Sequence, residues 1–178
     1  MLNKGTLKML NITCVLVSLN IKHFTGRRID VKATYDVANA NAVDAGVGRY
    51  NKQLFPHCGV LKAIASAGGN IRTHFYKNTR PWSDNAVRIL PSTNVIPYDD
   101  EFNKLQAVWR GYVDSFVNDY KSHISLAQRD LRSMFNYADY PSQTDICTYF
   151  NTSLSFMPVP TNDFRVDLPQ AVLDKMRD

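Results

Sequence analysis

The longest regular pattern of apolar positions runs from about residue 99 to residue 136. Ten apolar side chains recur there at steps of three and four residues: Phe102, Leu105, Trp109, Tyr112, Phe116, Tyr120, Ile124, Ala127, Leu131 and Met134. This spacing places them on one face of an α-helix. Asp99, Asp100 and Glu101 stand at its start, where carboxylates favour the positive end of the helix dipole. The pattern predicts one long helix near 99–136, roughly 55 Å in length.

Apolar and polar residues alternate with a period of two in other segments, which indicates β-strands. In residues 12–24, Val15, Val17, Leu19 and Ile21 share one face, and the opposite face is mixed. This alternation predicts a strand in a sheet that is covered on one side. Shorter strands are expected near 86–90 and 153–157. Helices are expected at 31–42, 60–76 and 168–178, and a turn at 79–85.

These elements predict an α+β fold, in which a small antiparallel sheet packs with helices and the long helix dominates. The chain has 178 residues, of which 44% are hydrophobic, with 9 Tyr and 9 Phe. A chain of this length and composition can bury a core of its own. No repeat or linker interrupts it, so we expect a single domain spanning 1–178.

Charge is distributed unevenly along the chain. Residues 1–80 hold twelve Lys/Arg and three Asp, a formal charge of +9, whereas residues 81–178 hold nine Lys/Arg, twelve Asp and one Glu, a charge of −4. A basic surface attracts polyanions such as nucleic acids. The alternative is that the acidic half of the chain packs against the basic half.

No motif for catalysis, metal binding or a cofactor is present. The three cysteines, Cys14, Cys58 and Cys147, lack CxxC spacing, and His57 beside Cys58 is typical of a turn next to a buried thiol. The segment 46–49 has neither Walker nor Rossmann spacing. We therefore expect a protein that is not an enzyme and that holds no metal ion or cofactor.

Cations alternate with aromatic rings in three segments of the basic half, at 23–28, 49–52 and 72–82. Single-stranded nucleic acid is bound by this combination, because cations neutralise phosphates and rings stack on bases. The candidate nucleic-acid-binding residues are Arg27, Arg28, Arg49, Tyr50, Lys52, Arg72, Tyr76, Lys77, Arg80 and Trp82. The alternative is that Phe75 and Trp82 are core residues and that the cations are solvated at helix ends.

Three further cations, Arg110, Lys121 and Arg132, stand eleven residues apart on the predicted long helix. In an uninterrupted helix they line up along one flank of the apolar stripe. Such a basic flank suits a nucleic-acid groove or the acidic flank of another copy of the chain. Ordinary solvated positions explain it nearly as well.

The N-terminal segment does not match a secretory signal or a membrane span. Asn11, Ser18 and Asn20 interrupt its apolar residues, and no small-residue cleavage site follows. The stretch is shorter than the ~20 apolar residues of a membrane helix. We expect an intracellular protein without a membrane partner.

Several motifs together resemble a family of tailed-bacteriophage and prophage proteins that has no assigned activity. The resemblance covers most of the chain and rests on the segments 25–28, 48–52, 79–84, 136–141, 158–160 and 163–166. It implies a viral protein made in the cytoplasm of a bacterial host, and it implies no substrate.

Three functional hypotheses follow from the residues and the resemblance together. The first is a non-enzymatic, phage-encoded protein that binds nucleic acid, with a preference for single-stranded DNA. The second is an inhibitor of a bacterial anti-phage defence complex, which binds a host protein in the manner of an anti-CRISPR protein. The third is a self-assembling component of the virion, in which the long helix packs on other copies in a homo-oligomer.

Overall fold

The fold is α+β, as the pattern predicts, and it is built on a four-stranded antiparallel sheet. The computed structural model describes residues 14–82 and 87–159. The strands β1 (Cys14–Lys22), β4 (Arg80–Pro81), β5 (Arg88–Pro91) and β6 (Asn151–Pro158) form this sheet in the order β4-β5-β1-β6. A second, two-stranded sheet pairs β2 (Arg27–Ile29) with β3 (Asn51–Gln53).

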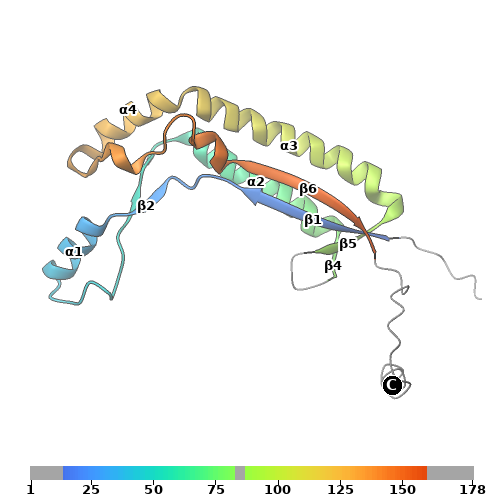
Figure 1. Ribbon diagram of the computed structural model, residues 1–178, viewed down its shortest axis with the longest axis horizontal. Coiled ribbons are helices and arrows are strands. Elements are labelled where there is room, and N and C mark those ends of the chain that lie inside the picture. The colour runs from blue at the N-terminus through green and yellow to red at the C-terminus, as the bar shows by residue number, and fades with distance from the viewer. Residues whose placement is uncertain (1–13, 83–86, 160–178) are drawn as a thin grey trace, which may run out of the picture.

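Helices cover one face of the four-stranded sheet, as the alternation in the first strand predicts. Leu19 and Ile21 of β1 pack against the core made by α2 (Gly59–Asn78) and α3 (Val95–Asn118). Val17, on the same face, is fully buried with Phe75 of α2 and Tyr98 of α3. Figure 1 shows the two helices on one side of β1 and β6. The opposite face of the sheet has no helix against it among the described residues.

The long helix is present, but its bounds differ from those that the pattern predicts. The helix begins at Val95, before the predicted start. Pro97 does not prevent this, because the N–H groups of a first turn have no partner within the helix and a proline there removes no hydrogen bond. Asp119 interrupts it, and α4 (Tyr120–Leu131) continues after a bend (Figure 1). It ends before residue 136, because Arg132 adopts a left-handed φ of 48°.

The other predicted elements lie close to their expected positions. The helix expected at 31–42 is α1 (Val31–Ala40), which Asp30 caps by accepting a hydrogen bond from the Ala33 N–H. The helix expected at 60–76 is α2, and the strands expected near 86–90 and 153–157 are β5 and β6. The turn expected at 79–85 is wrong at its start, because Arg80 and Pro81 pair with β5 as the strand β4. The rest of that turn at 83–85 and the helix expected at 168–178 lie outside the described residues.

Aromatic side chains from distant segments form the centre of the core. The Phe55 ring contacts Phe116, Tyr120 and Tyr140 edge-on or tilted, with centroids 5.3–6.0 Å apart. The Tyr140 hydroxyl donates a hydrogen bond of 2.9 Å to the Leu54 carbonyl. These contacts join the segment before α2 to α3, α4 and the chain that follows them, through the 3₁₀ turns η2 (Arg132–Met134) and η3 (Tyr137–Asp139).

Residues 27–53 extend from this body as an arm made of β2, α1, the loop 41–50 and β3 (Figure 1). Gly26 begins it with a φ of 64°, and a Cβ there would lie 2.7 Å from the Leu61 side chain. Both observations favour glycine at this junction. Among the described residues, none of the helices has the length and apolar character needed to cross a membrane.

Candidate nucleic-acid interface

The ten candidate nucleic-acid-binding residues do not form one surface. Five of them belong to the arm: Arg27, Arg28, Arg49, Tyr50 and Lys52. The other five belong to α2 and the β4 segment: Arg72, Tyr76, Lys77, Arg80 and Trp82. Figure 1 places α1 and β4 toward opposite ends of the long axis. The cations and aromatic rings of the basic half are therefore divided between two separate parts of the fold, the arm and the α2–β4 region.

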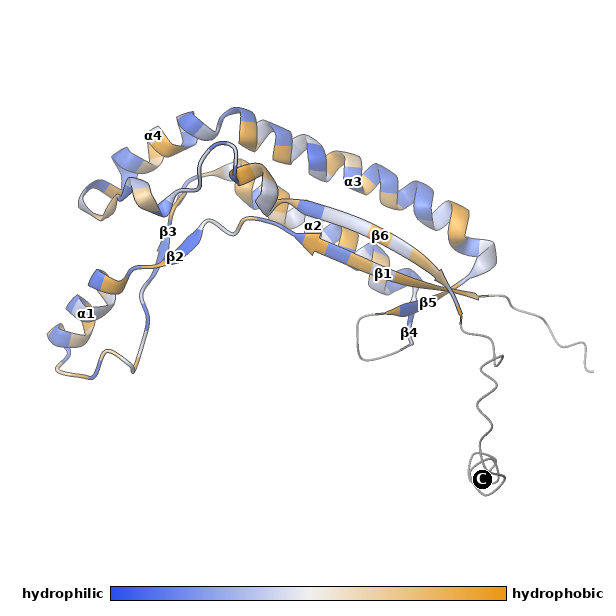
Figure 2. Ribbon diagram, viewed as in Figure 1, coloured by the Kyte–Doolittle hydropathy of each residue, from blue (hydrophilic) through white to orange (hydrophobic). Residues whose placement is uncertain are grey.

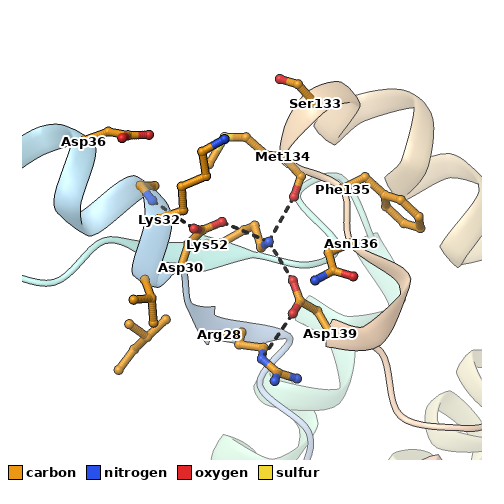
Figure 3. A pocket seen from close by; sticks show the side chains of 13 residues that line it. Arg28, Asp30, Lys32, Asp36, Lys52, Ser133, Met134, Phe135, Asn136 and Asp139 are labelled. Carbon is orange, nitrogen blue, oxygen red and sulfur yellow. Dashed lines mark hydrogen bonds and ion pairs between the residues drawn. The ribbon is translucent and has the colours of Figure 1, made fainter.

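Lys52 is not available to a phosphate, which corrects the prediction for this residue. Its side chain is 5% exposed, and its Nζ lies 3.0 Å from Asp30 and 2.6 Å from Asp139. The Nζ also donates a hydrogen bond of 2.9 Å to the Met134 carbonyl (Figure 3). Arg28 pairs with the same Asp139 at 3.3 Å. The acidic half of the chain does pack against the basic half at this cluster.

The Lys52 cluster also sets the protonation of its members. Burial by itself lowers the pKa of the Lys52 ammonium, but hydrogen bonds and charges from Asp139 and Asp30 outweigh burial and raise it above the ordinary value. The Ala33 N–H and Lys52 lower the pKa of Asp30. A cavity of about 510 Å³ adjoins the cluster between α1 and the η2–η3 segment. The cluster ties the arm to the chain after α4.

Among the candidates on α2, Arg72 is partly buried, whereas Tyr76 and Lys77 are exposed. Arg72 is partly buried, and its guanidinium donates to the Ile21 carbonyl at 3.5 Å. Tyr76 is 55% exposed, and the guanidinium of Arg88 lies over its ring at 4.9 Å. Arg88 itself donates to the Thr79 hydroxyl and carbonyl, so it is fixed in place. Phe75 is a core residue, as the alternative expected, whereas Trp82 is 49% exposed and is not.

Arg80 and Trp82 share the uncovered face of the four-stranded sheet. Arg80 pairs with Ile89, Ile89 with Leu16, and Leu16 with Met157, so these four side chains form one row across that face. Only Arg80 and Met157 of this row are exposed, because Leu16 is 6% exposed and Ile89 is partly buried. Trp82 continues the ladder, because its N–H bonds to the Val87 carbonyl at 3.2 Å. Side chains alternate along a strand, and Trp82 therefore lies on the side of Arg80.

The same face continues along β1 and β6 as a ladder of polar pairs. We call this ladder, together with the row of Arg80, the open face. Its pairs are Ser18 with Ser155, Asn20 with Ser153, and Lys22 with Asn151. All of these side chains are exposed except Ser18, which is partly exposed. The Lys22 ammonium lies 5.5 Å from the centroid of the Tyr149 ring, which is 38% exposed. The ladder from Leu16 to Lys22 spans about 20 Å.

The open face therefore carries a cation and an exposed ring at each end. None of the four strands contains an aspartate or glutamate. Lys22 and Tyr149 are absent from the sequence-based candidates, because they are 127 positions apart and neither lies in a basic segment. The alternation of Ser18, Asn20 and Lys22 with apolar residues is the signal that marks them in the sequence.

The predicted basic flank of the long helix is not continuous. Arg110, Lys121 and Arg132 are all exposed. The break at Asp119 separates Arg110 from Lys121, and Arg132 lies beyond the end of α4 with its positive φ. The alignment assumes an uninterrupted helix, so these cations do not form one straight row.

The cysteine and histidine side chains form no recognisable chemical centre. Cys58 is buried, and its sulfur lies 3.9 Å from Nδ1 of His123. The other ring nitrogen of His123 is buried without a partner, so no third group orients the imidazole as in a catalytic triad. Within residues 14–82 and 87–159, no group of three or more His, Cys, Asp or Glu is placed to hold a metal ion.

Comparison with protein-family models, with curated proteins and with solved structures found no match for this chain.

Proposed function

We propose that the protein binds single-stranded nucleic acid, DNA in the first place, across the open face of its sheet. The observation that carries the proposal is a ladder of hydroxyl and amide side chains on strands that contain no aspartate or glutamate, with a cation and an exposed ring at each end of the face. Lys22 and Arg80 would neutralise phosphates, and Tyr149 and Trp82 would stack on bases. The serine and asparagine side chains between them would hydrogen-bond to the strand.

A single strand suits this surface better than a duplex. Stacking on a protein ring requires an unpaired base, and duplex readout requires an element that enters a groove. The major groove of a duplex admits an α-helix or a two-stranded β-ribbon, whereas the open face belongs to a four-stranded sheet with α2 and α3 behind it. The role is one of binding, without a chemical step. By its resemblance to phage proteins, we propose that it acts in the cytoplasm of a bacterial host.

Fluorescence anisotropy with a labelled oligonucleotide tests whether Lys22 and Arg80 neutralise phosphates. On a single strand, the logarithm of the affinity falls with the logarithm of the salt concentration with a slope of about −0.7 per neutralised phosphate. We expect Lys22→Ala and Arg80→Ala each to reduce this slope by about 0.7. Lys121→Ala, an exposed cation on α4 away from the open face, is the matched control and leaves the slope unchanged. Affinity that does not respond to salt contradicts phosphate binding.

Tryptophan fluorescence tests whether Trp82 stacks on a base. The chain has two tryptophans, of which Trp82 is exposed and Trp109 is 3% exposed. Oligonucleotide should quench the wild type and leave Trp82→Phe unquenched. Trp82→Ala should weaken binding by about 5- to 150-fold, the equivalent of ~1–3 kcal/mol per stacked base. Tyr137→Ala removes a ring elsewhere that is more exposed than Trp82, at 70% against 49%, and serves as the control. Equal losses in both alanine variants would refute the assignment of Trp82.

A further inference from the structure

The arm carries seven of the seventeen exposed large hydrophobic residues of the described chain. Seven large apolar side chains between residues 29 and 50 are 42–75% exposed: Ile29, Val31, Tyr35, Val37, Val43, Val47 and Tyr50. Ala38 is the one residue of this stretch that is buried. Figure 2 shows the apolar positions of α1 on a helix that stands apart from the body. Nothing in the proposed nucleic-acid site uses these side chains.

The arm is held in place at its base and is open beyond it. The β2–β3 pairing and the Lys52 cluster fix the base. The Tyr50 N–H donates to the Thr34 hydroxyl, and the Asp30 N–H donates to the Tyr50 carbonyl, so the loop 41–50 is closed against α1. The exposed apolar side chains therefore belong to an ordered element.

The arm carries both a ridge and a hollow. Val31 and Tyr35 stand one turn apart on α1 and form the ridge. Val37, Val43, Val47 and Tyr50 line the hollow, a cavity of about 300 Å³ between α1 and the loop 41–50. An aromatic side chain fits into a space of this size. A ridge and a hollow on the same element are what a two-fold contact between identical chains requires, since each copy supplies both halves of the contact.

The charge of the arm favours a copy of the same chain over a polyanion. Outside the Lys52 cluster, residues 27–53 carry three cations, Arg27, Lys32 and Arg49, and two carboxylates, Asp36 and Asp44. The net charge is therefore small, and two copies repel each other little. Phosphate groups gain little from a nearly neutral apolar surface.

The apolar area is large enough for a specific interface. The seven side chains expose on the order of 300–600 Å², which is the size of the largest apolar patch on a typical monomer, and such a patch is often functional. With the polar rim it approaches the ~800 Å² that each partner contributes to a standard interface. We propose that two copies of the chain associate through their arms, with the ridge of each copy seated in the hollow of the other.

Sedimentation velocity of the full chain, from roughly 1 to 100 µM, tests the proposal, because interfaces of standard size have dissociation constants of about 1 µM or lower. We expect the wild type to be dimeric at the upper end of this range. Tyr35→Glu places a charge on the ridge, and Val47→Asp places one at the hollow, on a side chain that is 75% exposed. Each should weaken dimerisation at least about tenfold. Ile96→Glu, which adds a carboxylate at an equally exposed apolar residue of α3, is the control.

Circular dichroism verifies that each variant is folded, and Val47→Asp, a change in a loop, keeps the test valid if Tyr35→Glu unfolds. A wild-type chain that stays monomeric at all concentrations overturns the proposal. The arm would then be a binding surface for a different protein, such as a host protein. A dimer that survives both substitutions overturns it as well. Trp82→Ala should leave the dimer intact, so failure of this proposal is separate from failure of nucleic-acid binding.

Discussion

Replacing Lys52 by methionine should remove the contact that holds the arm to the body. The ammonium is shared by Asp30 and Asp139, whose side chains are 16% and 11% exposed, and by the Met134 carbonyl. Methionine has a similar length and no charge, so the two carboxylates would be left partly buried without their cation. Removing one partner of a buried ion pair costs about 3–5 kcal/mol.

The remaining contacts of the two carboxylates place the expected loss at the lower end of that range. Asp30 keeps the Ala33 N–H, and Asp139 keeps Arg28 at 3.3 Å. We therefore expect the free energy of unfolding to fall by about 3 kcal/mol. Urea unfolding followed by circular dichroism measures the loss from the midpoint at a constant m-value. Lys62→Met, at an exposed lysine of α2, is the matched control and should change the free energy by less than about 0.5 kcal/mol.

The pH dependence of the loss identifies its origin. The pKa of Lys52 is raised in the folded state, so its stabilisation is complete below its unfolded pKa of ~10.4 and disappears as the pH rises through the folded value. The pKa of Asp30 is lowered, so its contribution is present above ~3.9 and disappears as the pH falls through the folded value. The difference between wild type and Lys52→Met should therefore be constant near neutrality and shrink at both extremes. A variant as stable as Lys62→Met at pH 7 would refute this account of the cluster.

Two further predictions concern tyrosine and cysteine side chains. Burial raises the pKa of Tyr98, Tyr120 and Tyr140 to about 12, so part of the tyrosinate absorbance should appear only near that pH. Because these folded pKa values exceed the unfolded value of ~10, the free energy of unfolding should fall as the pH rises above ~10. If all nine tyrosines of the folded protein titrate together as the pH is raised, this expectation is wrong. Cys147 is exposed and Cys58 is buried, so mass spectrometry after brief alkylation should find the label on Cys147 first and on Cys58 only after unfolding.

The elements that the sequence predicts well are those whose signal is local. The stripe from Phe102 to Ala127 and the alternation from Val15 to Ile21 arise from neighbours along the chain. The alternation forms the expected strand, and the stripe is helical, although Asp119 divides it into α3 and α4. Their ends are less predictable, because single residues decide them. Pro97 is compatible with a first turn, and the positive φ of Arg132 ends α4.

The candidate site depends on contacts between distant residues, which the sequence does not show. Lys52 resembles its basic neighbours until the fold brings Asp139 to it from 87 positions away. Trp82 and Phe75 look alike as apolar residues of one segment, yet strand pairing leaves Trp82 exposed and helix packing buries Phe75.

The sequence by itself determined the α+β class, the covered and open faces of the first strand, and the positions of the helices, because periodicity in hydrophobicity is a property of neighbouring residues. The tertiary structure alone decided which cations are free, which rings are exposed, and that Lys22 and Tyr149 meet at one end of the open face. Burial and pairing are properties of the packed chain, since each depends on residues that only folding brings together.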